Sequence, residues 1–424
     1  MPNVGSLGGF VASRRRLLRT LAGAAGVGAV ARPVSALAQE SGSSVPPNVP
    51  KWMREQGKPI LSPAYGLPSA FERDVVRRPT DLTPTDTSSW SFTPLQDLHG
   101  VITPNGLVFE RHHGGVPAID PDEHRLIVHG LVERSLIFTM DQLLRFPSVS
   151  RTFFLECSGN SLTEYNNPQP SVQTSHGLLS CCEWTGVLLS TILQEAGVRP
   201  DAAWILAEGA DAAGMTRSVP IGKALDDALV VYSQNGERLR PEQGYPLRLL
   251  LPGYEGNMSI KWLRRIEVGD EPWHTREETS KYTDLMPDGE ARRFTYVMEA
   301  KSVITNPAPP RSIGSPGFHE ISGLAWSGNG RIAHVDVTVD GGRSWARAQL
   351  QEPVLPKCLT RFRLPWDWTG APARLASRAT DETGYVQPTR QQLIAARGRN
   401  YVYHYNAIQT WDIDQNGAIS NAAA

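Results

Sequence analysis

A change of pattern near Arg292 constrains the fold of this 424-residue chain more than any other feature. From about residue 96 to residue 291, short apolar strands alternate with helical spacing. Beyond residue 292 only strands and turns are indicated: residues 332–339 alternate in hydrophobicity and run through Asp340-Gly341-Gly342 into residues 344–350, as in a β-hairpin. The chain is also too long for one ordinary core. We therefore predict an α+β protein, with a mixed α/β domain over 96–291 and an all-β immunoglobulin-like sandwich over 292–412.

The hydrophobic pattern also predicts individual elements. Strands are expected at 125–130, 151–156, 245–251 and 260–268, and helices at 139–146 and 184–196. Thr139 has the position of a helix N-cap, and Gly197 that of a C-cap. Outside the two domains, the Pro-, Ser- and Thr-rich residues 39–95 predict an extended N-terminal arm, and residues 413–424 predict a disordered tail.

The N-terminal segment has the features of an export signal. Ser13-Arg14-Arg15-Arg16-Leu17 precedes a small-residue apolar stretch at 21–30, and Ala36-Leu37-Ala38 offers a cleavage site. That stretch is far shorter than the roughly 20 apolar residues that span a bilayer. We expect residues 1–38 to be a twin-arginine signal peptide that delivers the folded chain to the periplasm, where the mature protein is soluble.

Charge and cysteine content exclude several classes of function. Of the 42 basic and 43 acidic residues, five Arg and no acid lie in 1–38, which leaves a net charge of −6 and no basic stripe for nucleic acid or a membrane surface. No spacing fits a c-type haem, an iron–sulfur cluster or structural zinc, so we expect no haem or flavin on this chain. Cys181 and Cys182 are interpreted as buried small hydrophobes. The cysteines are Cys157, Cys181, Cys182 and Cys358.

Cys157 is the cysteine best placed for chemistry. The predicted strand 151–156 ends immediately before it, and Ser158-Gly159-Asn160 indicates a turn directly after it. Ligands bind at strand ends in mixed folds, where Gly allows the backbone to approach them closely. The alternative from this position alone is an inert buried thiol.

Cations gather in two other loops. Arg111, His112 and His113 precede the strand at 125–130, while Arg248 and Lys261 flank the Gly-containing loop 252–259. Arg and Lys with nearby backbone N–H groups suit an oxyanion or a phosphate. The loop matches neither a Walker loop nor a dinucleotide fingerprint. Taken singly, these residues could equally be solvated basic loops or charges at strand ends.

Together these segments resemble the sulfite oxidase family of molybdenum enzymes over roughly residues 95–412. The motifs that carry the resemblance are Phe109-Glu110-Arg111-His112-His113, Cys157-Ser158-Gly159-Asn160, Asn235-Gly236, Gly244-Tyr245-Pro246-Leu247-Arg248, Lys261-Trp262-Leu263, Asp340-Gly341-Gly342-Arg343-Ser344-Trp345 and Val386-Gln387-Pro388. The resemblance implies a mononuclear molybdenum–molybdopterin cofactor with Cys157 as its one protein ligand. It also implies catalytic roles for Tyr282 and Arg111, and a sandwich domain that mediates dimerisation. The implied cofactor-binding residues are Arg111, His112, His113, Asp211, Arg248, Ser259, Ile260 and Lys261.

The sequence departs from the sulfite-specific pattern of that family. Ser161-Leu162-Thr163 stands where a second Arg is usual, Thr174-Ser175-His176-Gly177 where a Trp is usual, and Gln243 replaces a His. The loss of fixed positive charge and bulk implies a larger substrate than free sulfite. The runs 154–160 and 278–288 are similar to the molybdenum subunits of sulfane dehydrogenases in bacterial thiosulfate oxidation.

This narrower similarity implies a specific reaction and specific partners. The substrate would be sulfane sulfur on a carrier protein, and the oxygen would come from water. The electrons would pass to a c-type, di-haem cytochrome subunit, with two copies of this chain in a heterotetramer. The alternatives are a sulfite dehydrogenase with a cytochrome acceptor, a reductase of S- or N-oxides, and a secreted binding protein without cofactor. The predicted twin-arginine signal peptide argues against the last alternative, because that export route carries folded proteins and so suits a cofactor inserted before export.

Overall fold

The computed structural model describes residues 65–79, 85–293, 295–399 and 403–422, together with the single residues 53 and 56. Residues Ser69–Ala424 form one compact unit. The predicted signal peptide and the first part of the predicted arm lie outside the described residues. Among the described residues, no helix is long and apolar enough to cross a membrane.

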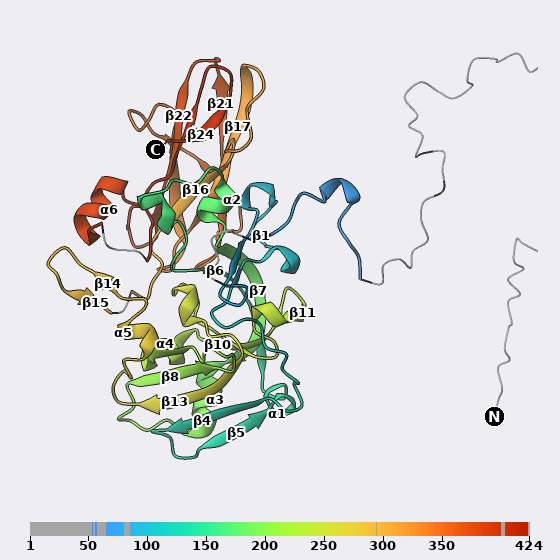
Figure 1. Ribbon diagram of the computed structural model, residues 1–424, viewed down its shortest axis with the longest axis vertical. Helices are drawn as coiled ribbons and strands as arrows, with labels where there is room; N and C mark the ends of the chain where they lie inside the picture. The colour runs from blue at the N-terminus through green and yellow to red at the C-terminus, as the bar shows by residue number, and fades with distance from the viewer. Residues whose placement is uncertain are drawn as a thin grey trace, which may run out of the picture. The chain divides into compact units, whose positions relative to one another are not determined.

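Two five-stranded sheets form the first domain (Figure 1). The first is mixed, because its central strand pairs with one neighbour in parallel and with the other antiparallel. Its strand order is β5 (Leu136–Thr139), β4 (Arg125–Gly130), β13 (Leu263–Gly269), β8 (Trp204–Gly209), β9 (Thr216–Pro220). The second has the order β11 (Glu237–Arg238), β10 (Leu229–Gln234), β7 (Leu179–Leu188), β6 (Ser148–Glu156), and β12 (Arg248–Leu250) also pairs with β10.

The first domain also contains short helices. Thr139 caps the first one as predicted, with its hydroxyl accepting a hydrogen bond from the Gln142 backbone N–H. Ile192 and Leu193 of the longest helix of this domain are fully buried in the same core as Val128 and Ile266, so that helix fixes the mixed sheet from one side. The helices are α1 (Met140–Leu143), α2 (Val172–His176), α3 (Leu189–Ala196), α4 (Ile221–Asp226) and α5 (Arg276–Thr279).

The prediction of one helix over 184–196 was wrong in its first half. Residues up to Leu188 extend strand β7, which pairs along its length with β6 and with β10. Hydrogen bonds on both edges outweigh the local helical spacing. The helix proper ends where predicted, at Gly197 in the left-handed conformation (φ 72°). The strand predicted over 260–268 likewise begins only at Leu263, because Trp262 has a positive φ of 54°.

A small sheet links the described part of the predicted arm to the first domain. Its strands are β1 (Arg78–Pro79), β2 (Trp90–Phe92) and β3 (Glu110–Arg111), in that order. In the antiparallel register Trp90 lies opposite Arg111, and the guanidinium carbon is 5.4 Å from the indole centroid. The arm therefore helps to orient Arg111.

Two antiparallel sheets form the second domain. One contains β16 (Lys301–Asn306), β17 (Gly317–Trp326), β21 (Thr360–Trp368) and β20 (Gln349–Leu350). The other contains β19 (Ala346–Arg347), β18 (Ile332–Thr338), β22 (Ala373–Asp381), β23 (Thr410–Ile413) and β24 (Ile419–Asn421). Trp326, Phe362 and Trp411 are fully buried in the core of this domain. The fold class, mixed α/β followed by an immunoglobulin-like sandwich, is confirmed.

The prediction of a disordered tail over 413–424 was wrong. Strand β24 pairs with β23, and Trp411 lies opposite Asn421. The Asn421 side-chain amide also donates to Glu164 Oε2 at 2.8 Å, on the first domain. The short alternation in this segment is too brief to be recognised without its partner strand.

The sandwich core continues into the first domain. Phe154 of β6 and Cys181 of β7 belong to the same buried cluster as Trp326. Cys181 is fully buried, as interpreted from the sequence, and its Sγ lies 3.3 Å from Cys358 Sγ. The Phe154 backbone N–H donates to Lys357 O at 3.0 Å. Strand β6, which leads to Cys157, is thus packed on the second domain.

Candidate cofactor site

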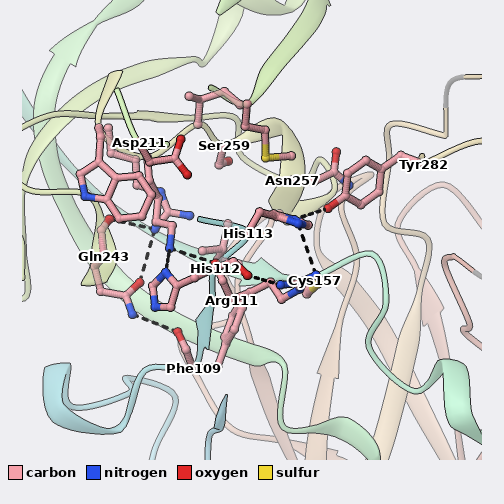
Figure 2. A pocket seen from close by; sticks show the side chains of 17 residues that line it. Phe109, Arg111, His112, His113, Cys157, Asp211, Gln243, Asn257, Ser259 and Tyr282 are labelled. Atoms are coloured by element: carbon pink, nitrogen blue, oxygen red, sulfur yellow. Dashed lines mark hydrogen bonds between the residues drawn. The ribbon is translucent and has the colours of Figure 1, made fainter. Parts of the chain in front are cut away.

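A single cavity collects every residue that the sequence nominated for chemistry (Figure 2). It lies where β6 ends, and loops from several parts of the chain contribute to it. The nominated residues in its wall are Arg111, His112, His113, Cys157, Asp211, Arg248, Ser259, Ile260, Lys261 and Tyr282. The cations and the Cys157 thiol therefore face the same cavity and do not point to separate surfaces of the protein.

Cys157 occupies the first position after β6. Its backbone N–H donates to Leu178 O at 3.0 Å, and the Asn160 N–H donates to Cys157 O at 2.9 Å, which closes the turn. A Cβ on Gly256 would meet Glu156 O at 2.7 Å, so only glycine allows the 256–258 segment to pass this closely. Burial raises the pKa of the thiol, and the Arg111 cation opposes this rise. Burial therefore favours the protonated thiol, and a cation bound to the sulfur would favour the thiolate.

Two buried cations form one wall of the cavity. Burial lowers the pKa of Lys261 well below its usual range, and burial lowers the pKa of Arg248 to about 10. Lys261 Nζ donates to Arg111 O and Glu242 O, each at 3.0 Å, and Arg248 Nε has no hydrogen-bond partner. Neither side chain is paired with a carboxylate among the described residues. The three protons of Lys261 Nζ are taken by protein acceptors, so Lys261 would attract a phosphate through its charge, whereas Arg248 Nε could donate to a phosphate directly. The wall therefore fits an anionic ligand.

His112 and His113 are oriented by cationic donors. Lys261 Nζ lies 2.9 Å from His112 Nδ1, and Arg111 Nη2 lies 3.4 Å from His113 Nδ1. A guanidinium group can only donate, so His113 Nδ1 accepts and His113 Nε2 carries the proton. His112 Nε2 lies 2.7 Å from Glu110 Oε2, and this hydrogen bond lowers the pKa of Glu110, so the carboxylate accepts and His112 Nε2 also carries its proton. Burial lowers the pKa of His113 to about 4, which keeps this ring neutral at pH 7.

The protonated Nε2 of His113 therefore donates to Tyr282. The nitrogen lies 2.9 Å from the phenol oxygen, which leaves the phenol proton free to donate into the cavity. Burial and the neighbouring Cys157 raise the pKa of Tyr282, so the phenol stays protonated. The Tyr403 ring centroid, 5.0 Å away, holds the Tyr282 ring from the other side. Arg111, His113 and Tyr282 form a directed chain of donors that ends beside Cys157.

Comparison with known proteins identifies the cofactor class. Residues 113–277 match the model of an oxidoreductase molybdopterin binding domain, and residues 292–411 match that of a Mo-co oxidoreductase dimerisation domain. Sulfite oxidase of Gallus gallus is 32% identical over 68% of this chain and 68% of its own length. The chain belongs to the sulfite oxidase family. It is a molybdopterin oxidoreductase that acts on sulfur donors, and the unpaired cations of the cavity fit its molybdenum–molybdopterin cofactor.

Other members of the family are also similar. The mitochondrial sulfite oxidase of Rattus norvegicus is 30% identical over 77% of this chain, which spans 65% of that protein, and a nitrate reductase of Solanum lycopersicum is 33% identical over 70% of this chain, which spans 37% of that protein. Among solved structures, a chain of the sulfane dehydrogenase SoxCD from Paracoccus pantotrophus is 50% identical, with a TM-score of 0.87. That match covers 88% of this chain and 97% of the other.

The positions where the sequence departs from the sulfite-specific pattern can now be placed. Leu162, in the stretch Ser161-Leu162-Thr163 that departs from this pattern, has a side chain that is 40% exposed and does not line the cavity. Gln243 does line the cavity, and its side-chain amide donates to Phe109 O at 2.9 Å. His176, in the region of the missing Trp, is fully buried in α2. Of these positions, only Gln243 contributes to the cavity wall among the described residues, and its side chain carries no charge.

Two residues of the site were missed from the sequence. Asn257 lines the cavity, and its amide donates to Ser158 Oγ at 3.0 Å and Glu255 Oε2 at 2.9 Å. Arg217 is fully buried, donates to Asn257 Oδ1, and lies 5.2 Å from the Tyr282 ring centroid. Asn257 belongs to the loop already singled out as Gly-containing, which was a usable signal. Arg217 is a single cation in strand β9 and gave none.

Proposed function

We propose that this chain oxidises sulfane sulfur carried on a partner protein and passes the electrons to a c-type cytochrome subunit. The proposal is carried by the 50% identity to a sulfane dehydrogenase chain over 88% of this chain. The uncharged stretch Ser161-Leu162-Thr163, which stands where the sulfite-specific pattern has a second Arg, supports it. Removing one charged donor from an oxyanion site costs about 1.5–3 kcal/mol, which disfavours a free dianion. A substrate bound through its carrier does not need that charge.

The cofactor would be held by the residues that line the cavity. Cys157 is proposed as the one protein ligand of molybdenum, because its thiol lines the cavity and a metal cation bound to the sulfur would favour the thiolate. Lys261 and Arg248 would hold the pterin phosphate, together with Ser259 and the backbone of Ile260. When bound, the cofactor supplies oxygen-atom transfer and accepts two electrons.

The remaining side chains act on substrate and protons. Arg111 has a delocalised charge next to Cys157 and is proposed to orient the sulfur oxyanion as it forms. Tyr282, whose oxygen accepts from His113, is proposed to direct its free proton at the reacting oxygen and to exchange it during turnover. His113 stays neutral and fixes the direction of that exchange.

Location and assembly are part of the same proposal. The twin-arginine leader over 1–38 supports export of the folded holoenzyme to the periplasm. The match to a dimerisation domain over 292–411 supports a homodimer through the sandwich. Transfer to the cytochrome subunit is supported by the similarity to SoxCD and would make a heterotetramer.

Steady-state turnover with two substrates tests the function. The purified enzyme and its cytochrome would be supplied with a persulfide-loaded carrier protein or with free sulfite, and cytochrome reduction would be followed. We expect kcat/KM for the carrier to exceed that for sulfite by at least about tenfold, as loss of one charged contact implies. A preference for sulfite would instead indicate a sulfite dehydrogenase. Absence of molybdenum in the purified protein would contradict both.

A further inference from the structure

A buried ion pair joins the sandwich to the strand that carries Cys157. Lys301, the first residue of β16, lies with its Nζ 2.9 Å from Oε1 of Glu156, the last residue of β6. The two side chains are 1% and 0% exposed and are 145 residues apart in the chain. The other carboxylate oxygen accepts from Trp326 Nε1 at 2.6 Å, so the sandwich binds both oxygens of Glu156.

The same groups hold the far side of the cysteine turn. Asn160 Nδ2 donates to Glu156 Oε1 at 2.9 Å, across the turn that contains Cys157. Lys301 Nζ donates to Ser161 Oγ at 3.0 Å and to Asn160 O at 3.4 Å. The His404 backbone N–H, also from the second domain, donates to Ser158 O at 2.7 Å. The residues on both sides of Cys157 are therefore held by the sandwich.

Stability alone is a weak reason for such an arrangement. Two charges buried without water lose their hydration, and a well-packed apolar pair of similar size is often at least as stable. What the charges do provide is direction, because each hydrogen bond fixes one atom of the turn. The direction fixed here is that of the peptide units on either side of the Cys157 Cα.

We infer that Lys301, Glu156 and Trp326 are positioning residues, which set the orientation of the Cys157 thiolate toward the metal. Lys301 and Trp326 of the second domain act through Glu156 of the first domain. The inference rests on the proposed role of Cys157 as the molybdenum ligand. The sandwich would then have a part in the active site, in addition to any role in dimerisation.

The test compares two ion pairs that cross the same boundary. Lys301→Met and Glu156→Gln each break the buried pair. Lys357→Met serves as the matched control, because Lys357 Nζ pairs with Asp227 Oδ2 at 2.5 Å across the domains without contacting the cysteine turn. Trp326→Phe removes one hydrogen bond and keeps an aromatic ring in the core, although the smaller ring leaves a cavity that should itself lower the melting temperature. Glu156→Gln/Lys301→Gln replaces the charges by two amides that can still hydrogen-bond.

The holoenzymes are compared by their melting temperature, by their Mo(V) electron paramagnetic resonance g-values, and by kcat and KM measured separately. We expect Lys301→Met, Glu156→Gln and Trp326→Phe to shift the g-values and to lower kcat about tenfold or more, with KM changed less than about twofold. The paired amides should restore most of both. Lys357→Met should lower the melting temperature and leave the spectrum and kcat unchanged.

Two outcomes would overturn the inference. One is an unchanged spectrum and kcat in Lys301→Met and Trp326→Phe, with only the melting temperature lowered. The other is a spectral change of equal size in Lys357→Met. If Lys301→Met and Glu156→Gln fail to fold, Trp326→Phe and the paired amides decide the question. Failure of the proposed ligand role of Cys157 is recognised separately, since the wild-type protein would then lack molybdenum or keep its spectrum in Cys157→Ser, and a preference for free sulfite would change the substrate without affecting this inference.

Discussion

His113 Nε2 lies 2.9 Å from Tyr282 Oη although 169 residues separate them in the chain. His113 Nδ1 accepts from Arg111, so His113 Nε2 is the donor and the Tyr282 oxygen is the acceptor. The phenol proton is therefore free to donate into the cavity. Tyr282→Phe removes that proton and little else. We expect kcat to fall about 10²-fold with KM changed only slightly, measured by cytochrome reduction. Tyr403→Phe is the control, and an equal loss there would contradict a specific role for the Tyr282 hydroxyl.

Cys157→Ser tests the metal ligand. An alkoxide is a poorer ligand than a thiolate for this metal, and serine does not ionise at neutral pH. Activity should fall by more than about a hundredfold, and the molybdenum content, measured by mass spectrometry of the metal, should fall as well. Cys182→Ser changes a buried thiol outside the cavity wall and should keep both. Full activity in Cys157→Ser would remove the proposed mechanism.

Lys261→Met tests the anion wall. The substitution removes a buried cation that forms no ion pair with a carboxylate among the described residues, at a cost of about 1.5–3 kcal/mol of binding to a phosphate. Pterin retained after dialysis should therefore fall about tenfold or more, read from the fluorescence of the oxidised pterin. Lys281, an exposed neighbour of Tyr282, provides the control for a general loss of charge. Equal retention in Lys261→Met and Lys281→Met would show that the wall does not bind the cofactor.

Glu255 makes stability depend on pH in an unusual direction. Burial raises the pKa of its carboxyl group to about 8. Between the unfolded value near 4.5 and about 8, the folded state binds the extra proton, so stability falls as the pH rises. Each unit of pKa difference is worth about 1.4 kcal/mol. Urea unfolding at pH 5 and pH 8 should show a larger loss for the wild type than for Glu255→Gln, and parallel losses would contradict the raised pKa.

Arg217 and Glu278 lie fully buried, with Nε and Oε1 3.5 Å apart. Arg217→Met leaves the carboxylate without its counter-charge and should cost about 3–5 kcal/mol in free energy of unfolding, measured by urea denaturation. Arg217→Met/Glu278→Gln removes both charges and should recover much of that loss. No recovery in the double variant would mean that Arg217 stabilises by packing on Tyr282 instead.

Local signals nominated only part of the site, and Tyr282 and Asp211 came from the resemblance to the sulfite oxidase family. Cys157 at the end of a strand and the Arg111-His112-His113 run are recognisable from neighbouring residues alone, and the structure places them in one cavity with Lys261. What the sequence lacks is information on partners far along the chain. Arg217 has no local feature that distinguishes it from a surface cation, because only the fold brings it under Tyr282.

The same limit explains the errors in the fold. Trp184 follows a helical spacing locally but lies in a strand that is hydrogen-bonded on both edges. Residues 419–421 are too few to predict a strand, yet β23 supplies a complete partner. Elements whose own pattern is long, such as β4 and β18, were predicted correctly.

The network around Glu156 also has a consequence for the order of synthesis. The ribosome completes the Cys157 turn long before it reaches Lys301 and Trp326, which hold that turn. Until both have emerged, Glu156 lacks the groups that neutralise it and fix its direction. A nascent chain interrupted before residue 326 therefore contains Cys157 but lacks the contacts that orient it. On this view, the cofactor is inserted only after the second domain has been synthesised.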